Sequence, residues 1–231
     1  MELIAYGALQ PEAQALGSGK GLMSDLLILG TGVHGGEMAH IVERINAQHP
    51  TWTLLGHVAP KATEQTSFAG YPVVGSAESM DAILSRYPNA KLVADNEFPK
   101  CIPLPAERRA TLIDPGSYVH PTARIGRGCV IYPQCFVGLN ATLGDGVFML
   151  SGCTINHDNV LEENVVAASK VTLAGFVHVE AGAYLGQCCT VRQYLRIGRN
   201  AMIGMGAVVV KNVEPNAVMV GNPARKLKDR T

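Results

Sequence analysis

One short polar segment of the sequence, Ile155-Asn156-His157-Asp158-Asn159, carries side chains suited to acid–base chemistry. An imidazole can act as a general base near neutral pH, and a carboxylate beside it can hold or polarise the ring. A surface histidine in a polar turn would give the same pattern, because a His-Asp pair indicates a site only statistically. The segment therefore has to be judged from the elements that position it.

A six-residue repeat surrounds the segment and runs from residue 113 to 214. Every sixth position from Val119 onward is apolar, and small or slim side chains dominate four residues after each of these. Asn159 is the polar exception in that second register. The in-phase apolar residues are Val119, Ile125, Ile131, Val137, Leu143, Met149, Ile155, Leu161, Ala167, Leu173, Val179, Leu185, Val191, Ile197, Ile203 and Val209.

A period of six fits neither a helix, with its period of 3.6, nor an amphipathic strand, with its period of 2. It is typical of a parallel β-helix, in which short strands are joined by tight bends and each rung is completed by the next. The alternative is a chance alignment of apolar residues, and the unbroken length of the run argues against it. We predict a solenoid over residues 113–214, with His157 and Asp158 projecting outward from a bend.

Composition excludes several classes of function. The 231 residues include 19 Lys plus Arg and 19 Asp plus Glu, so no global basic field favours nucleic acid or an acidic membrane. No apolar run reaches the ~18 residues that span a bilayer, and the first residues do not resemble a secretory signal. We expect a cytoplasmic protein. Core thiols are predicted in the small-residue register, without zinc spacing, at Cys129, Cys135, Cys153 and Cys189.

The sequence before the repeat predicts an α/β, Rossmann-like βαβ domain over residues 23–105, after a leader (1–22) to which no function is assigned. A buried strand at 26–29 leads through a glycine-rich turn to a helix at 37–46, and such glycines let a backbone approach a phosphate. The third glycine of a dinucleotide fingerprint is out of place. Further strands are predicted at 54–58 and 91–94, a helix at 76–87, and a C-terminal tail at 215–231.

The combination of these motifs is similar to one bacterial family. Gly-x-Gly-x-His in a small βα domain, in-phase hexapeptides with Asn-His-Asp, and a later Gly-Asn-Pro-Ala resemble the sialic acid O-acetyltransferase family. This family includes the UDP-4-amino-sugar N-acetyltransferases, and the resemblance covers residues 26–228. It implies a left-handed β-helix that forms a homotrimer, uses acetyl-CoA and no metal, and acetylates a sugar or nucleotide sugar in cell-surface polysaccharide biosynthesis.

The resemblance also implies roles for single residues. His157 matches the catalytic base, Asp158 its acidic neighbour, and Gly175 the residue whose amide contacts the thioester carbonyl. Gly175 follows His157 by three hexads, so an amide one rung away can face the developing oxyanion. The expected acetyl-CoA contacts are Val166, Gln187, Arg196, Met205 and Lys211. The acceptor-binding residues expected in the N-terminal domain are Gly30, Thr31, Gly32 and His34.

Two departures from the family pattern fall in the acceptor domain. Ala59-Pro60 stands where an acidic residue would hold a ribose, and Ala94-Asp95-Asn96-Glu97 replaces a Gly-Asn-type loop. The acceptor is therefore less well defined than acetyl-CoA, and either its amine or its hydroxyl could be the acetylated group.

Two rival interpretations remain. A γ-type carbonic anhydrase would need zinc on three histidines, but His120, His157 and His178 fall on three different hexad positions. A non-catalytic trimeric scaffold or sugar-binding module on the same fold is the other alternative, since fold alone does not prove function.

Overall fold

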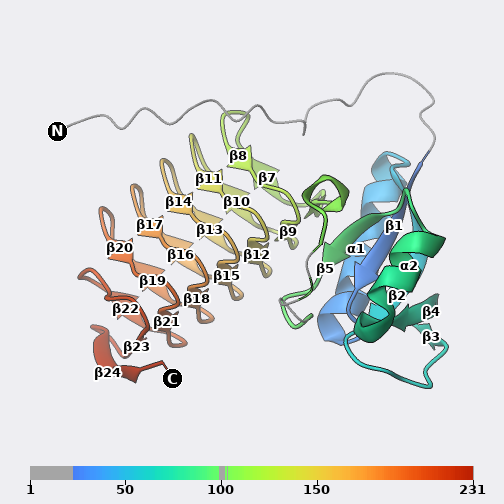
Figure 1. Ribbon diagram of the computed structural model, residues 1–231. Helices are drawn as coiled ribbons and strands as arrows, with labels where there is room; N and C mark the ends of the chain where they lie inside the picture. Colours follow the sequence, from blue (N-terminus) through green and yellow to red (C-terminus); the bar gives the residue numbers. More distant parts are fainter. Residues whose placement is uncertain (1–22, 99–101, 103, 231) are drawn as a thin grey trace.

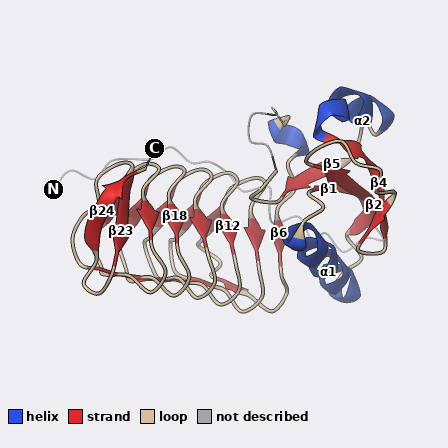
Figure 2. Ribbon diagram, turned by 90° about the horizontal axis from the view of Figure 1, so that it is seen from below, coloured by secondary structure: helices blue, strands red, loops and turns tan. Residues whose placement is uncertain are grey.

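The computed structural model describes residues 23–98, 102 and 104–230, and the predicted leader lies outside them. Within this part, an N-terminal α/β unit packs beside the first turns of a long solenoid (Figure 1, Figure 2). None of the helices in the described ranges is long and apolar enough to cross a membrane.

The solenoid has three faces, each a parallel sheet of two-residue strands. The first face holds β7 (Tyr118–Val119), β10 (Phe136–Val137), β13 (Thr154–Ile155), β16 (Thr172–Leu173), β19 (Thr190–Val191) and β22 (Val208–Val209). The second holds β8 (Arg124–Ile125), β11 (Thr142–Leu143), β14 (Val160–Leu161), β17 (His178–Val179) and β20 (Arg196–Ile197). The third holds β6 (Leu112–Ile113), β9 (Val130–Ile131), β12 (Phe148–Met149), β15 (Val166–Ala167), β18 (Tyr184–Leu185) and β21 (Met202–Ile203).

Each hexad supplies one strand and one bend, as the repeat predicted. In β10, for example, Val137 is fully buried while Phe136 faces outward. Successive strands of a face are in parallel register, Phe136 with Thr154 and Thr154 with Thr172, so the same position recurs after 18 residues. The prediction of a parallel β-helix over the repeat region is confirmed.

The segment predicted as a C-terminal tail continues the third face. There β23 (Ala217–Val220) pairs parallel with β21, and β24 (Arg225–Asp229) pairs antiparallel with β23. Strand β24 is exposed along its whole length and rich in basic residues. Charged side chains on an edge strand discourage pairing with other chains. Strand β24 therefore covers the last strand of the third face and protects this edge from further pairing.

The N-terminal unit is a five-stranded sheet of order β3-β4-β2-β1-β5 within the described residues. Its strands are parallel except for β3, which is antiparallel to β4. The elements are β1 (Ser24–Leu29), α1 (Val33–Gln48), β2 (Trp52–Ala59), β3 (Ser67–Phe68), β4 (Tyr71–Ser76), the 3-10 turn Ala77–Ser79, α2 (Met80–Arg86), β5 (Lys91–Ala94) and the 3-10 turn Ala106–Arg108.

Alternate residues of β1 face the two helices. Leu26 and Ile28 share an apolar cluster with α1, and Leu27 and Leu29 share one with α2. Helices therefore cover both faces of the sheet, as expected for parallel strands. The strands β3 and β4 were not predicted, and α1 begins at Val33, which shortens the glycine turn. Assignment of the unit to the Rossmann class stays a prediction.

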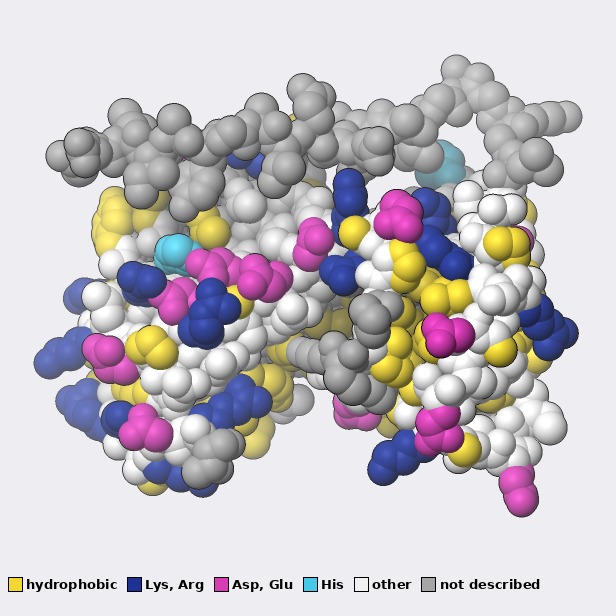
Figure 3. All heavy atoms as spheres, in the orientation of Figure 1, with side chains coloured by type: hydrophobic (Ala, Val, Ile, Leu, Met, Phe, Trp, Pro, Cys, Tyr) yellow, Lys and Arg dark blue, Asp and Glu magenta, His cyan; other side chains and the backbone are white. Residues whose placement is uncertain are grey.

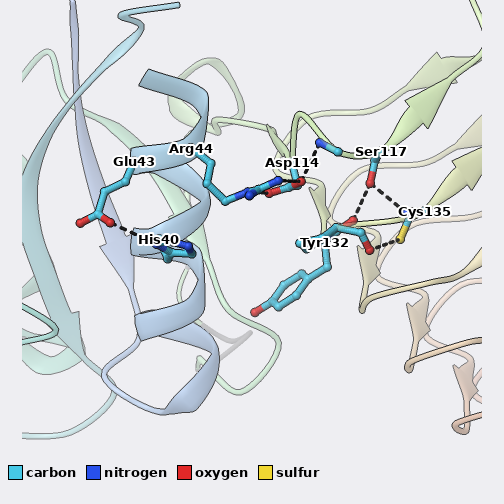
Figure 4. Close-up of polar contacts among 9 residues, drawn as sticks. His40, Glu43, Arg44, Asp114, Ser117, Tyr132 and Cys135 are labelled. Carbon is cyan, nitrogen blue, oxygen red and sulfur yellow. Dashed lines mark hydrogen bonds and ion pairs between the residues drawn. The ribbon is translucent and has the colours of Figure 1, made fainter. Parts of the chain in front are cut away.

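The two units share a core on the outer side of the third face. Val130, Phe148 and Val166 point outward from that face and join the cluster of α1 and β1. An ion pair lies beside this cluster, with Arg44 Nε 2.6 Å from Asp114 Oδ2 and the Asp114 side chain fully buried (Figure 4). Figure 4 also shows Tyr132 pointing from the solenoid toward α1. The N-terminal unit is thus anchored by both apolar and ionic contacts.

Candidate active site

The first corner of the solenoid, between the first and second faces, carries the predicted base. Its bend at residues 156–159 joins β13 to β14, and Asp158 adopts a left-handed backbone conformation with φ of 56°. Asparagine and aspartate tolerate this region better than most residues. Asn159 is fully buried beneath the bend, where its Nδ2 donates to the Asn156 carbonyl and its Oδ1 accepts from the Val177 amide. The polar exception in the repeat therefore ties the bend to the next rung.

His157 and Asp158 form a hydrogen-bonded pair. The His157 Nδ1 lies 3.0 Å from Asp158 Oδ2, and Asn140 Nδ2 donates to Asp158 Oδ1 at 3.1 Å. These hydrogen bonds, first from His157 and then from Asn140, lower the pKa of Asp158, which favours its charged form. When Nδ1 donates to the carboxylate, Nε2 is left free to accept a proton. The pair can therefore act as an oriented general base.

Gly175 lies directly over the His157 ring, one rung further along the solenoid. A Cβ atom placed on Gly175 would be 2.6 Å from Nε2 of His157, so no larger residue fits there without moving the imidazole. Within the described residues, the Gly175 amide donates no backbone hydrogen bond. A free N–H beside the base can donate to an oxyanion, and the missing side chain lets the imidazole pack directly against the next rung.

An open groove of about 470 Å³ begins at His157 and runs toward the N-terminal end of the solenoid. Tyr118 and Phe136 form part of its wall, with their rings stacked 5.3 Å apart. The groove is lined mainly by apolar and aromatic surface. The lining residues are Tyr118, His120, Phe136, Gly138, Leu139, Asn156 and His157. Sequence reasoning missed the aromatic pair, because strand residues that face outward follow no fixed pattern in the repeat.

The five residues predicted to contact acetyl-CoA are spread over the molecule. Lys211 lies on the first corner, in the same column as His157, and Arg196 lies on the second face. Gln187 and Met205 are exposed on the third corner, one rung apart. Val166 is buried between the third face and the N-terminal unit. One chain does not bring these five together, and their roles stay predictions.

Arg196 belongs to a network of charges along the second and neighbouring faces. Its guanidinium pairs with the buried carboxylate of Glu180, and Arg199 pairs with Glu162 at 3.5 Å. His178 Nε2 lies 2.8 Å from the same Glu162. Figure 3 shows acidic and basic side chains interspersed over the visible surface of the solenoid. Arg196 is therefore already neutralised by a partner of its own chain.

The predicted acceptor residues lie where β1 ends and α1 begins, at the carboxyl edge of the sheet. Gly30 has φ of 146°, and a Cβ atom on it would lie 2.5 Å from the carboxyl carbon of Asp95. Thr31 and Gly32 follow, and Gly32 is the N-cap of α1. His34 contacts the solenoid, with its ring 5.5 Å from that of Phe148. The edge is thus shared between the N-terminal unit and the solenoid.

A buried carboxylate lies against the glycine turn. Asp95 is 6% exposed, and burial raises its pKa although its Oδ1 accepts hydrogen bonds from the Glu97 and Phe98 amides. In its charged form, this group would repel a phosphate that approached Gly30. The sequence departure at residues 94–97 therefore falls on the loop predicted to hold the acceptor.

The rival zinc site would use histidines from neighbouring subunits, and within one chain its three candidates do not converge. His157 pairs with Asp158, His178 with Glu162, and His120 with Thr122. Within the described ranges, no group of three or more His, Cys, Asp or Glu side chains is placed to hold a metal ion.

Comparison with solved structures gives matches over most of the chain, although no protein-family model matches. The acetyltransferase domain of PglB from Neisseria gonorrhoeae FA1090 has a TM-score of 0.76 at 26% identity, covering 88% of this chain and 99% of that domain. Its complex with acetyl coenzyme A gives 0.74 at 25% identity, with coverage of 89% and 100%. PerB from Caulobacter crescentus, solved with CoA and GDP-perosamine, shares the fold with a TM-score of 0.74 at 23% identity, over 90% and 99% of the two chains.

Curated relatives match a shorter stretch. The acyl-[acyl-carrier-protein]–UDP-N-acetylglucosamine O-acyltransferase of Herminiimonas arsenicoxydans is 40% identical over 70 residues, which is 30% of this chain. The match spans 27% of that relative, so the chain covers about a quarter of its length.

The solenoid matches those of the left-handed β-helix acyltransferases. The neighbours at 25–26% identity are an acetyltransferase domain, free and with acetyl coenzyme A, and the resemblance predicted from the sequence is confirmed.

Proposed function

We propose that this chain is an acetyl-CoA-dependent acetyltransferase that acts on the amine or hydroxyl of a sugar, with a nucleotide-linked amino sugar as the first candidate. The observation that carries the proposal is the arrangement of His157, Asp158 and Gly175. An oriented base and a glycine whose amide makes no backbone hydrogen bond lie on adjacent rungs, in contact with each other and beside an open groove. The acetyl coenzyme A complex of a structural neighbour supports the choice of donor.

The reaction is a direct transfer within a ternary complex. Nε2 of His157 removes a proton from the acceptor as its nitrogen or oxygen attacks the thioester carbonyl. The Gly175 amide donates to the oxyanion of the tetrahedral intermediate. The C–S bond then breaks, and the thiolate of CoA takes up the proton. A cysteine nucleophile is excluded at the core positions, where burial raises the pKa of Cys129 and of Cys189 to about 12.

The acceptor is proposed to bind at the carboxyl edge of the N-terminal sheet, at Gly30, Thr31, Gly32 and His34. A helix N-terminus favours an anionic group there. The buried Asp95 opposes a phosphate on Gly30, so the acceptor set to be tested must include sugars without a diphosphate.

A homotrimer is part of the proposal. Large apolar side chains stay exposed around the first corner, among them Leu139, Val160, Phe176 and Tyr194. Phe176 and Tyr194 stack with their rings 5.0 Å apart, and exposed apolar surface is typical of interaction sites. Neighbouring copies that covered this corner would enclose the donor, and light scattering on the purified chain measures the assembly directly.

The test is acetyl-CoA-dependent release of free CoA, followed by chromatography because exposed Cys188 would consume a thiol dye. The acceptors are UDP-, dTDP- and GDP-linked amino sugars, the free amino sugars, sialic acid and simple amino acids. His157→Ala should abolish turnover, and Asp158→Asn should reduce it by one to two orders of magnitude. His178→Ala is the matched control, because His178 also pairs with a carboxylate.

Turnover that His157→Ala leaves intact would disprove the role of the base. If acetyl-CoA binds but no acceptor is used, the acceptor lies outside the panel and the donor half of the proposal stands. If acetyl-CoA does not bind, the chain is a scaffold or sugar-binding module on the same fold.

A further inference from the structure

The groove at His157 has a chemical character that acetyl transfer does not use. Its first-face wall is aromatic only on the N-terminal side of the base. The outward residues of successive rungs are Tyr118 and Phe136, and then Thr154 and Thr172 from the rung of the base onward. Leu139, one rung before His157 in the same column, adds an exposed aliphatic side chain at the mouth of the groove. An acetyl group needs none of this apolar surface.

The distribution of basic residues along the first corner indicates how CoA is oriented along the solenoid axis. The bends on the C-terminal side of the base carry Arg192 and Lys211, whereas the bends at 120–122 and 138–140 carry no Lys or Arg. Arginine and lysine suit the phosphates of CoA. Lys211 lies three rungs beyond His157, which is about 14 Å at the usual strand spacing. The donor arm therefore extends from the base toward the C-terminal end of the solenoid.

If the CoA arm extends from the thioester carbon toward the C-terminal end of the solenoid, the acyl group extends toward the N-terminal end. Gly175 packs against the imidazole, and its amide, which makes no backbone hydrogen bond in the described residues, is the donor proposed for the carbonyl oxygen. The acyl chain then enters the groove past Leu139 toward Phe136 and Tyr118. The groove extends back over two rungs, about 10 Å, which holds an acyl chain of several carbons.

We propose that this groove is an acyl-chain subsite and that the chain transfers acyl groups longer than acetyl from CoA. The inference rests on the proposed function, because it uses the same base and the same donor. In the step, the acceptor nitrogen or oxygen bonds to the acyl carbonyl carbon and the C–S bond breaks. The acceptor proton passes through His157 to the CoA sulfur, so acyl-CoA and acceptor give acylated acceptor and free CoA.

The first experiment measures binding, so that it does not depend on knowing the acceptor. Calorimetry on the full chain compares acetyl-, butyryl- and hexanoyl-CoA. Hexanoyl-CoA should bind at least tenfold more tightly than acetyl-CoA, because its methylenes leave water for an apolar surface. Equal or weaker binding of the longer chains overturns the subsite, while binding of acetyl-CoA alone keeps the donor half of the proposed function.

Leu139→Trp, or the milder Leu139→Phe, fills the mouth of the groove. Either should lower the ratio of acetyl-CoA to hexanoyl-CoA dissociation constants by tenfold or more, with circular dichroism confirming the fold. Leu227→Ala removes an exposed apolar side chain from β24, outside the groove and the first corner, and should leave the ratio unchanged.

Turnover separates the acyl chain from the other candidate occupant, the acceptor. With an acceptor in hand, Leu139→Trp should lower kcat/KM for hexanoyl-CoA relative to acetyl-CoA by at least tenfold. If the variant instead raises KM for the acceptor equally with both donors, the groove holds the acceptor and the proposal is wrong.

Discussion

His157 is held on three sides, and each contact controls a different property of its ring. Asp158 fixes the orientation through Nδ1, and Gly175 packs closely against the ring. The ring of Phe176 is perpendicular to the imidazole, with centroids 5.3 Å apart and planes at 84°. Phe176 itself has a positive φ of 59°, which is uncommon for a bulky residue. The same bend position has a positive φ in other hexads, such as Lys170 and Tyr194, so this conformation belongs to the repeat.

Gly175→Ala tests the contact above the ring. The added Cβ would overlap the imidazole, so the ring must move away from the acyl carbon, and kcat should fall by about two orders of magnitude. The control is Gly36→Ala, whose Cβ would meet its nearest neighbour, Phe68, at an ordinary 3.6 Å. Steady-state kinetics and a thermal melt of both variants distinguish lost geometry from lost stability. Unchanged kcat in Gly175→Ala would contradict the assigned role.

Sequence reasoning at this scale succeeded where spacing determines position. His157 and Gly175 are 18 residues apart, and a period of six places them on adjacent rungs of a three-faced solenoid. It failed for groups that meet through tertiary contacts, such as Asp95 against Gly30 and Tyr132 against His34. Residues far apart in sequence with no shared period give no signal of such contacts.

At the scale of elements, the bend at 156–159 depends on one buried amide. Asn159 satisfies a carbonyl of its own bend and an amide of the next rung, both away from water. The period of the repeat predicted its place, but its function as an internal brace is visible only in the structure. The same register holds Val165 one hexad later, where an apolar side chain fills the core.

Asn159→Ala should destabilise the fold by about 2–4 kcal/mol, because two buried polar groups lose their partners. It should also reduce kcat, since the bend that carries His157 loses its support. Urea unfolding and kinetics provide the two measurements. Val165→Ala is the control in the same register: it removes packing alone, so its kcat should match that of the parent chain. Equal kinetic effects of the two variants would rule out a specific brace.

The N-terminal sheet contains a second buried polar group, His57 on β2. Its Nδ1 lies 3.0 Å from the Gly30 carbonyl, while its Nε2 has no partner in the described part of the chain. Burial lowers the pKa of His57 below the ordinary value of 6.5. Above pH 6.5 the ring is neutral in both the folded and unfolded states, so its contribution to stability is fully present there.

Below pH 6.5, His57 is protonated in the unfolded chain but stays neutral in the folded chain. The free energy of unfolding therefore decreases as the pH falls from 6.5 to the lower pKa of the folded state. The loss approaches about 1.4 kcal/mol per pH unit for one proton. His57→Leu should show a shallower decline in the free energy of unfolding between pH 7.5 and 5.5. His49→Gln, at an exposed position, should retain the slope of the parent chain. If the free energy of unfolding has the same pH dependence in the parent chain and in both variants, the pKa of His57 is not lowered by folding and the prediction is wrong.

At the scale of the whole molecule, the ion pair between the units joins groups that differ in exposure. Asp114 is fully buried and also accepts from the Gly116 amide, whereas the Arg44 side chain is 41% exposed. Loss of the arginine would leave a buried charge without compensation, and loss of the carboxylate charge would leave an arginine that water can solvate.

Arg44→Met should therefore lower the melting temperature more than Asp114→Asn does. Hydrogen exchange should quicken in α1, which loses its tie to the solenoid. Arg86→Met removes an exposed arginine at the end of α2 and serves as the control. A larger effect of Asp114→Asn would show that the hydrogen bonds to Asp114, and not its charge, hold the units together.

The 18-residue register also limits how this molecule can change in length. Deletion of a single hexad between His157 and Gly175 would shift every later column by one face, and the amide would no longer lie over the base. Three hexads can be lost or gained beyond Gly175 without disturbing the corner, because that adds or removes one whole turn. Only a change in length by complete turns of 18 residues therefore keeps the later columns on their faces.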